Sequence, residues 1–268
     1  MKLSYQGIQD KQGYAAAQVA LPQYDWAKMA EKTAEKPVWV HFGAGNIFRG
    51  FIAGLQQRLL NAGLAESGIV AAETFDYDII DKIYVPHDSM TLMVSLKADG
   101  STQKEVIASI AKGIKANCAD EAQWQQLTDV FTAPSLQMAS FTITEKGYGV
   151  APADLERGLT PVLAMGKVTA LLYERFKAGK LPLTVQSMDN CSHNGEKLRA
   201  SVMEIVAAWV KNGLVPADFE AYVNDEARVS FPWSMIDKIT PRPAEIIEKQ
   251  LMDAGFEDMQ PLPLIHIS

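Results

Sequence analysis

The sequence has few cysteines and no long apolar run. Cys118 and Cys191 are the two cysteines among 268 residues, and they form no C-x-x-C pair. This usage argues against a disulfide framework and a structural zinc site, and it indicates a reducing compartment. No apolar stretch approaches the roughly 18 to 20 residues that cross a bilayer, and the first residues lack the apolar run of a signal peptide. We therefore expect a cytoplasmic protein that does not span a membrane.

Basic residues are also scarce. The chain has 25 Lys and Arg against 32 Asp and Glu, a net charge of -7, which argues against a nucleic-acid partner. The four histidines are far apart and have no ligand spacing, so no metal site is expected. The phosphate-loop pattern G-x-x-x-x-G-K-[ST] and the hydrolase pattern G-x-S-x-G are both absent.

What the sequence does have is a repeated order of strand and helix. Short apolar runs without alternation, such as "VWVHF" and "GIVAAETF", are typical of strands covered on both faces. Each is followed by a helical pattern. In the first helix, one apolar face is expected from Ile47, Phe51, Ile52, Leu55 and Leu59. The order predicts an α/β fold with a doubly wound parallel sheet.

Two segments depart from this order, residues 1–36 and residues 91–116. Residues 1–36 are polar and mixed, and we expect an N-terminal arm on the surface. Residues 91–116 predict two strands joined by a turn at "ADGS", a small antiparallel insert. The helix in 160–179 is expected to have Pro161 in its first turn and Gly179 near its C-cap. The main domain is assigned to residues 37–260, followed by a tail, 261–268, that is a possible truncation point.

The stretch "VWVHFGAGNIFRGF" passes from a strand through a glycine loop into a helix. In a dinucleotide fold the first glycine makes the turn, and the second lets the backbone approach the pyrophosphate at the helix N-terminus. Gly43 and Gly45 fit these roles, with Ala44 and Asn46 beside them. Phe48 stands where the third glycine of G-x-G-x-x-G belongs, so a simple turn between core elements is the alternative.

An acidic residue after the second strand would hold the adenosine ribose of the cofactor. Glu73, in "IVAAETFDYD", ends the second predicted strand and follows Gly43 by 30 residues. A carboxylate there favours NAD, because it repels the additional phosphate of NADP. The alternative is a solvated loop that is rich in carboxylates.

Together with the glycine loop, three later segments resemble one enzyme family. "FTITEKGYG" (141–149), "VQSMDNCSHNG" (185–195) and "FPWSMIDKITP" (231–241) are similar to signature segments of the polyol and sugar-acid dehydrogenases. That family includes mannitol 2-dehydrogenase, fructuronate (mannonate) reductase and tagaturonate reductase. "GAGNIFRG" resembles the family's glycine loop and keeps its aromatic residue and its arginine as Phe48 and Arg49. The resemblance extends over roughly residues 37 to 260.

The resemblance implies an NAD-dependent enzyme that interconverts a secondary alcohol and a ketone on an open-chain polyol or sugar acid. It also implies an N-terminal Rossmann domain followed by a helical domain. Asn190 matches a family asparagine that stabilises the developing alkoxide, although Asp-Asn before a helix is also a common cap. Asp237 matches a position beside the substrate cleft. Glu145 follows a strand end near the expected nicotinamide, and a role in packing its loop is equally compatible.

One family element is missing from the pattern. The general acid/base of the family is a lysine in a K-x-x-x-x-N-x-x-H helix, and no lysine here has that spacing. Lys146 and Lys238 are available, but each is expected at a solvated edge. The helical second domain is expected to be absent from this chain. A truncated, catalytically idle NAD-binding module is therefore the alternative function, and the oligomeric state stays open.

Overall fold

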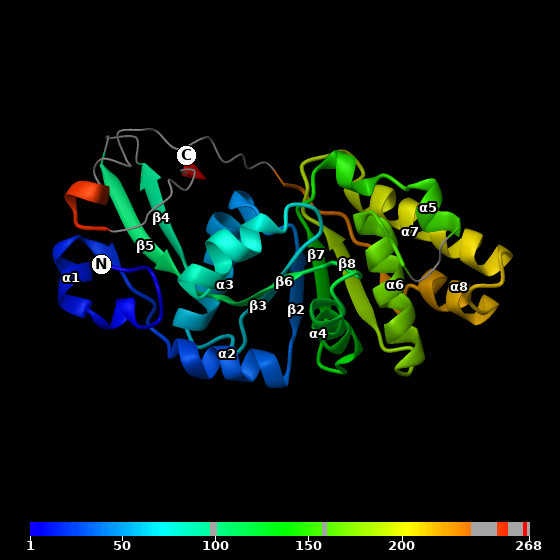
Figure 1. The fold of residues 1–268 in the computed structure, drawn as a ribbon, viewed down its shortest axis with the longest axis horizontal. Coiled ribbons are helices and arrows are strands. Elements are labelled where there is room, and N and C mark those ends of the chain that lie inside the picture. Colours follow the sequence, from blue (N-terminus) through cyan, green and yellow to red (C-terminus); the bar gives the residue numbers. More distant parts are fainter. Residues whose placement is uncertain (97–100, 157–159, 237–250, 257–264, 267–268) are drawn as a thin grey trace.

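A computed structural model describes residues 1–96, 101–156, 160–236, 251–256 and 265–266. Its centre is a sheet of six parallel strands in the order β6-β3-β2-β7-β8-β9 (Figure 1). The strands are β2 (Trp39–Phe42), β3 (Ile69–Glu73), β6 (Ile110–Lys115), β7 (Met138–Phe141), β8 (Leu183–Ser187) and β9 (Val229–Ser230). This is the strand order of a dinucleotide-binding sheet, and it reverses between β2 and β7. The predicted doubly wound α/β fold is confirmed.

Helical segments cover both faces of this sheet. Successive side chains of a strand point to opposite faces, and here both faces are apolar. Ile69 and Ala71 pack on one face, and Val70 and Ala72 on the other. The first face is covered by η2 (Phe48–Ile52), a π-helical turn, with α3 (Ala53–Asn61) and η3 (Ile80–Tyr84). The second is covered by α4 (Glu121–Thr132), α6 (Ala164–Lys177) and α7 (Asn194–Lys211).

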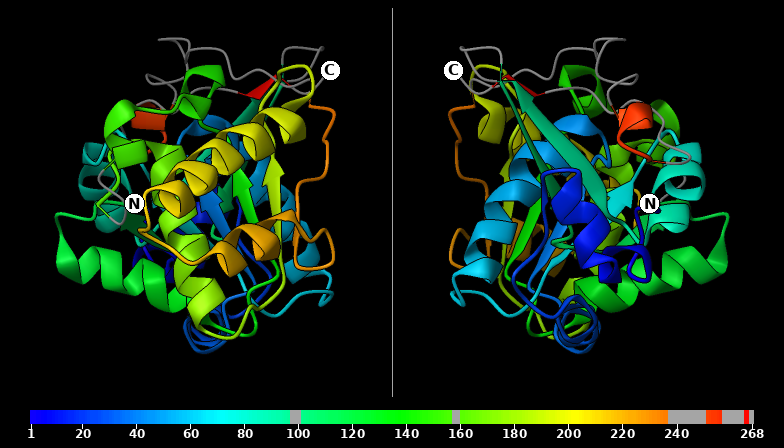
Figure 2. Two further views of the ribbon diagram at one scale, coloured as in Figure 1. Left: turned by 90° about the vertical axis from the view of Figure 1, so that its right-hand side faces the viewer. Right: turned by 90° about the vertical axis from the view of Figure 1, so that its left-hand side faces the viewer.

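Shorter elements complete the parallel-sheet region. η4 (Val85–His87) follows η3, and η5 (Glu145–Tyr148) and α5 (Pro152–Glu156) lie between β7 and α6. α8 (Ala217–Asn224) follows α7 and leads into β9, as the left view of Figure 2 shows. Within the described ranges, no helix combines the length and the apolar character that crossing a membrane requires.

A second, smaller sheet lies beside the first, in the order β1-β5-β4-β10. β4 (Thr91–Leu96) and β5 (Thr102–Ile107) pair antiparallel, which confirms the predicted insert, although turn residues 97–100 lie outside the described residues. The segment predicted as part of the insert after residue 107 instead forms β6, an edge strand of the parallel sheet. β1 (Val19–Ala20) and β10 (Ile265–His266) pair parallel with β5 and β4.

The first 36 residues form more than a surface arm. They contain η1 (Gly7–Gln9), α1 (Lys11–Ala16), β1 and α2 (Trp26–Glu35). The first three pack beside β4 and β5 (right view of Figure 2), whereas α2 contacts β6 of the parallel sheet. Leu3, Tyr14 and Val19 are buried in an apolar cluster with residues of both insert strands. A few apolar residues are enough to anchor this polar segment, since the insert strands supply the rest of the apolar cluster. The domain boundaries at residues 37 and 260 stay a prediction.

Two expectations about helices are corrected. The helix predicted with Pro161 in its first turn begins at Ala164, with Leu163 as N-cap, while Gly179 does follow its end with a φ of +122°. In α3 the side chains of Leu55 and Leu59 are 42% and 44% exposed. The sequence also predicts a helix in 243–256 ("PAEIIEKQLMDAGF"), most of which lies outside the described residues.

Candidate active site

The two predicted glycines lie at the carboxyl end of β2, in the glycine loop of residues 43–46. Gly43 has a φ of +101°, and a Cβ there would lie 2.1 Å from the carbonyl oxygen of Thr142. Gly45 has no positive φ of this kind, and a Cβ there would meet nothing within 4 Å. Gly43 is therefore required by the fold, whereas Gly45 leaves open space above the loop.

The backbone of this loop is fixed on both sides of Ala44. Its N–H donates to Glu73 Oε2 at 2.9 Å, and its carbonyl accepts from the Tyr84 hydroxyl at 3.0 Å. Gly43 N–H donates to the carbonyl of Ala72 at 2.9 Å, which continues the pairing of β2 with β3. The loop is thus rigid before any ligand arrives.

Arg49, in the π-helical turn after the loop, is a buried cation that pairs with no carboxylate of the described residues. Its side chain is 3% exposed, and Nη2 donates to Asn46 Oδ1. Nε and Nη1 are buried and have no hydrogen-bond partner within the described residues. Burial lowers the pKa of the guanidinium. An unsatisfied buried cation beside an open glycine loop fits an anionic group such as a pyrophosphate.

Glu73 ends β3 and joins three backbone amides. Oε2 accepts from Ala44, and Oε1 accepts from the N–H groups of Thr74 and Phe75 at 2.8 and 2.9 Å. A carboxylate offers about four lone-pair sites, so one acceptor site is left for a hydroxyl group. The predicted ribose ligand is therefore also the group that holds the glycine loop to the next strand.

Phe48 and His41 form a stacked pair behind the loop. Their ring centroids are 4.1 Å apart with an interplanar angle of 5°, and both side chains are fully buried. Burial lowers the pKa of His41 to about 3, so the ring is neutral at pH 7. Phe48 therefore acts through packing and has no exposed surface for a cofactor.

Asp189, which sequence reasoning did not select, joins two of the predicted motifs. Its carboxylate accepts from the backbone N–H groups of Ile143 and Thr144 at 3.0 and 2.9 Å and from the Tyr148 hydroxyl at 2.7 Å. Thr144 has a φ of +63°, a strained conformation that these bonds stabilise. Its position directly before Asn190, at the end of a strand, was the available signal.

Asn194 brings in the third motif. Its side chain accepts from the backbone N–H of Ser234 at 3.1 Å and donates to the carbonyls of Ser234 and Asp189 at 2.9 and 3.1 Å. A Cβ on Gly195 would lie 2.6 Å from the carbonyl oxygen of Pro232, so the two segments are in close contact. The three signature segments therefore meet at the carboxyl edge of the sheet.

The remaining predicted residues differ in their surroundings. Asn190 is exposed just beyond the end of β8, and no hydrogen bond of its side chain occurs within the described residues. Glu145 is exposed in η5 and pairs with Lys197 at 2.5 Å, which lowers the pKa of the carboxyl group. Asp237 lies outside the described residues. No group of three His, Cys, Asp or Glu in the described part of the chain could hold a metal ion.

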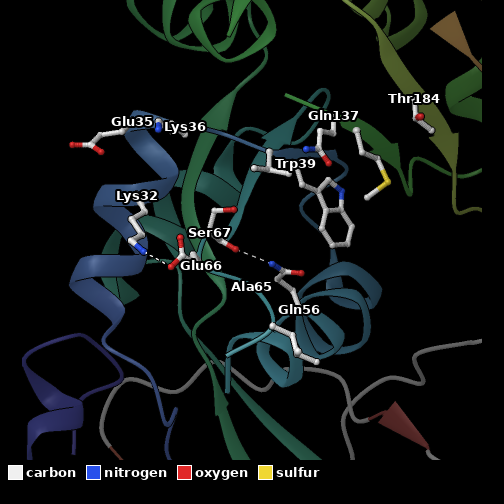
Figure 3. Close-up of a pocket in the computed structure, with 14 residues that line it drawn as sticks. Lys32, Glu35, Lys36, Trp39, Gln56, Ala65, Glu66, Ser67, Gln137 and Thr184 are labelled. Atoms are coloured by element: carbon white, nitrogen blue, oxygen red, sulfur yellow. Dashed lines mark hydrogen bonds and ion pairs between the residues drawn. The ribbon is translucent and has the colours of Figure 1, made fainter. Parts of the chain in front are cut away.

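A large groove lies at the opposite edge of the sheet. It has a volume of about 730 Å³ and is lined by Trp39, Gly68, Met138 and Thr184, which stand at the amino ends of strands (Figure 3). Ligands of open α/β sheets bind beyond the carboxyl ends. We therefore place the candidate active site at the glycine loop and not in this groove.

Comparison with known proteins agrees with this geometry. Residues 37–259 match the family model described as the mannitol dehydrogenase Rossmann domain. The chain belongs to the mannitol dehydrogenase family. It is 45% identical over 271 residues to a D-mannonate oxidoreductase of Thermotoga maritima. The aligned region covers 97% of this chain and 50% of that protein. The chain is 28% identical over 260 residues to the mannitol 2-dehydrogenase of Cereibacter sphaeroides, covering 92% and 50%.

A solved member of the mannitol dehydrogenase family has the same fold. The mannitol 2-dehydrogenase of Pseudomonas fluorescens, solved as a ternary complex with NAD and D-mannitol, superposes with a TM-score of 0.79 at 27% identity. The match covers 99% of this chain and 53% of that one. The chain thus spans about half the length of the curated relatives it matches. The predicted resemblance to the family is confirmed.

Proposed function

We propose that this chain is the cofactor-binding part of an NAD-dependent oxidoreductase that interconverts a secondary alcohol and a ketone on an open-chain polyol or sugar acid. The observation that supports it most is the pairing of a rigid, open glycine loop with the unsatisfied guanidinium of Arg49. Two free cysteines, Cys118 and Cys191, are in keeping with the cytoplasm. Mannonate/fructuronate and mannitol/fructose are the substrate pairs that the named relatives suggest.

Different residues at the carboxyl edge of the sheet would bind different groups of the cofactor. Gly43, Ala44, Gly45 and Asn46 would hold the pyrophosphate, with Arg49 supplying positive charge. Glu73 would accept a hydrogen bond from the adenosine ribose. Glu145 would lie beside the nicotinamide, as its position after β7 suggests.

NAD, when bound, supplies hydride acceptance and donation. The chain's own residues would orient the substrate and stabilise charge. Asn190 would donate a hydrogen bond to the oxygen that changes between hydroxyl and carbonyl, because charge develops on that atom. Asp189 would keep the strand end and the loop after β7 in register. Asp237 is proposed beside the substrate.

A proton must also leave or reach the substrate hydroxyl. Lys146 is exposed, Lys238 lies outside the described residues, and the family's K-x-x-x-x-N-x-x-H spacing is absent. The missing spacing is the reason to keep a second candidate function, an NAD-binding module that performs no chemistry by itself. The two candidates agree on the cofactor and differ on turnover.

The first experiment measures binding of NADH and NADPH to the purified chain by nicotinamide fluorescence, with Gly45→Val as the site variant. We expect saturable NADH binding, weaker NADPH binding because of Glu73, and loss of NADH binding in the variant. A Cβ at Gly45 meets no atom within 4 Å, so we expect the variant to keep the melting temperature and circular dichroism of the wild type. A folded chain that does not bind NADH would reject both candidates.

A second experiment separates the candidates. The NADH-binding chain is mixed with fructuronate, tagaturonate and fructose, and NADH oxidation is followed by absorbance. Turnover that Asn190→Ala abolishes while NADH affinity stays constant would support the oxidoreductase. Tight binding without turnover on any of the three substrates would favour the idle module.

A further inference from the structure

We propose that Phe75 is the platform on which the adenine ring of the dinucleotide stacks. The inference rests on the proposed NAD-binding function and adds to it the site of the base. Phe75 follows β3 by two residues, and its side chain is 89% exposed, which is unusual for phenylalanine. It belongs to the loop of residues 74–77, called here the adenosine loop.

The backbone under this ring is anchored to the same group as the glycine loop. Phe75 N–H donates to Glu73 Oε1 at 2.9 Å, while Ala44 N–H donates to Glu73 Oε2 at the same distance. One carboxylate therefore fixes the distance between the two loops. Because the backbone is already fixed, an exposed aromatic ring on it loses little conformational entropy when a flat ligand binds.

The far side of the adenosine loop is held by a buried lysine. Lys167 in α6 is 4% exposed, and its Nζ donates to the carbonyl of Thr74 at 2.7 Å and to the Tyr77 hydroxyl at 2.9 Å. The Tyr77 hydroxyl in turn donates to the carbonyl of Ala116, after β6, at 3.1 Å. The neighbours of Phe75 are thus tied to two other elements, and its own side chain stays open.

The segment that leads into α6, the helix that carries Lys167, also has exposed apolar side chains. Val162 and Leu163, 49% and 38% exposed, directly precede α6 and lie one helical turn before Lys167. Cys118 Sγ contacts the carbonyl of Pro161 at 3.1 Å, so this segment is attached to the loop after β6. An aromatic ring and two aliphatic side chains offer faces and no hydrogen bonds, which suits the flat surface of a purine.

The order in which pyrophosphate, ribose and base are bonded also places the adenine near Phe75. If the pyrophosphate lies on the glycine loop and the ribose at Glu73, the base attached to that ribose extends over the residues that follow Glu73. Stacking of a base on an aromatic side chain contributes about 1–3 kcal/mol, which corresponds to about 5- to 150-fold in affinity.

The test compares wild type, Phe75→Ala, Phe75→Trp and, as an exposed apolar control at the amino edge, Leu64→Ala, whose parent side chain is 77% exposed. NADH binding is measured directly, and ADP-ribose and inorganic pyrophosphate are measured as competitors. We expect Phe75→Ala to weaken NADH and ADP-ribose by the same factor, within about 5- to 150-fold. Pyrophosphate should be unchanged, the tryptophan should restore affinity, and the control should behave as wild type.

The outcomes separate this inference from the proposed function. Failure of the folded wild type to bind NADH rejects the function itself. Wild-type binding with unchanged affinity in Phe75→Ala overturns the stacking role alone. Equal weakening of pyrophosphate also overturns it, because the effect would then come from a displaced glycine loop.

Discussion

His41, which burial keeps neutral, lies in a chain of hydrogen bonds inside the sheet. Trp39 Nε1 donates to Ser140 Oγ at 2.7 Å, and Ser140 Oγ lies 2.7 Å from His41 Nδ1. On the other side His41 Nε2 lies 2.8 Å from Thr142 Oγ1, which reaches the carbonyl of Gly43. The chain is complete if Ser140 donates to Nδ1 and Nε2–H donates to Thr142. A proton on Nδ1 would break it.

This arrangement predicts a specific acid sensitivity of stability. The pKa of His41 is about 3 in the folded chain and about 6.5 when unfolded, so the unfolded state binds more protons between those values. Stability should fall by about 1.4 kcal/mol per pH unit from this group as pH decreases through that window. Urea unfolding of wild type and His41→Gln from pH 7 to pH 4 measures it. The variant should start less stable but have the shallower slope, and parallel slopes would contradict the assignment.

For individual residues, the sequence was a better guide to which ones belong to the site than to the role of each. Gly43 and Gly45 look equivalent in "GAGN", yet one is required by φ and a backbone contact and the other leaves space for a ligand. Glu73 was predicted for the ribose, and its three amide bonds with the loops appear only in three dimensions. Asp189 was not selected, because its partners, Ile143 and Thr144, are distant in the chain.

Among the elements, α6 is joined to the end of α4 and the start of β8 by one arginine. Arg175 is fully buried and donates to five backbone carbonyls, none of them on a carboxylate residue. The acceptors are the carbonyls of Phe131, Ala133, Leu136, Leu181 and Pro182. Only the planar fork of arginine has enough donors for this set.

Arg175→Lys should therefore destabilise the chain although it retains the charge. Three ammonium donors cannot satisfy five carbonyls, and hydrogen bonds to charged groups contribute about 1.5–3 kcal/mol each. We expect a loss of at least about 3 kcal/mol in the free energy of unfolding, measured by urea titration. Arg199→Lys is the matched control, because Arg199 is exposed and bonds only Asn224 Oδ1 within the described residues. A loss below about 1 kcal/mol in Arg175→Lys would show that water replaces the missing donors.

The elements of the parallel sheet were predictable, whereas the helix face after the glycine loop was not. Strands buried on both faces are recognisable as short apolar runs, as β2 and β3 were, whereas the edge strand β6 was assigned to the insert. The apolar face of α3 was counted with a period of 3.6, but residues Phe48–Ile52 form a π-helical turn. Such a turn holds an additional residue and rotates everything after it. Leu55 and Leu59 consequently face outward, and Gln56 and Gln57 are buried.

In the whole molecule the two sheets share one apolar cluster. Met93 of β4 and Ile107 of β5 pack with Phe48 beside the glycine loop. Gln57 of α3 donates to the carbonyl of Val106 and accepts from Ala108 N–H, both at 2.7 Å. The small sheet was predicted only as an insert, because its outer strands have two residues each and come from distant parts of the chain.

This sharing predicts that both sheets unfold together. In native-state hydrogen exchange, the slowest amides of β4 and β5 should have the same opening free energy as those of β2 and β3. NADH at one hundred times its dissociation constant should raise both values by about 2.7 kcal/mol, since it binds the folded state only. A lower value for β4 and β5 that NADH does not raise would show that the small sheet opens separately.

The strand pairing of the small sheet also determines when that sheet can form during translation. Ser95 of β4 pairs with Ile265 of β10, so the outer side of β4 has to wait for residues near the other end of the chain. The last strand of the parallel sheet, β9, ends 35 residues before β10 begins, so that sheet can be completed first. During that interval β4 presents an unpaired edge, the kind of surface on which nascent chains aggregate. Slow translation of the residues between β9 and β10 would prolong this exposure.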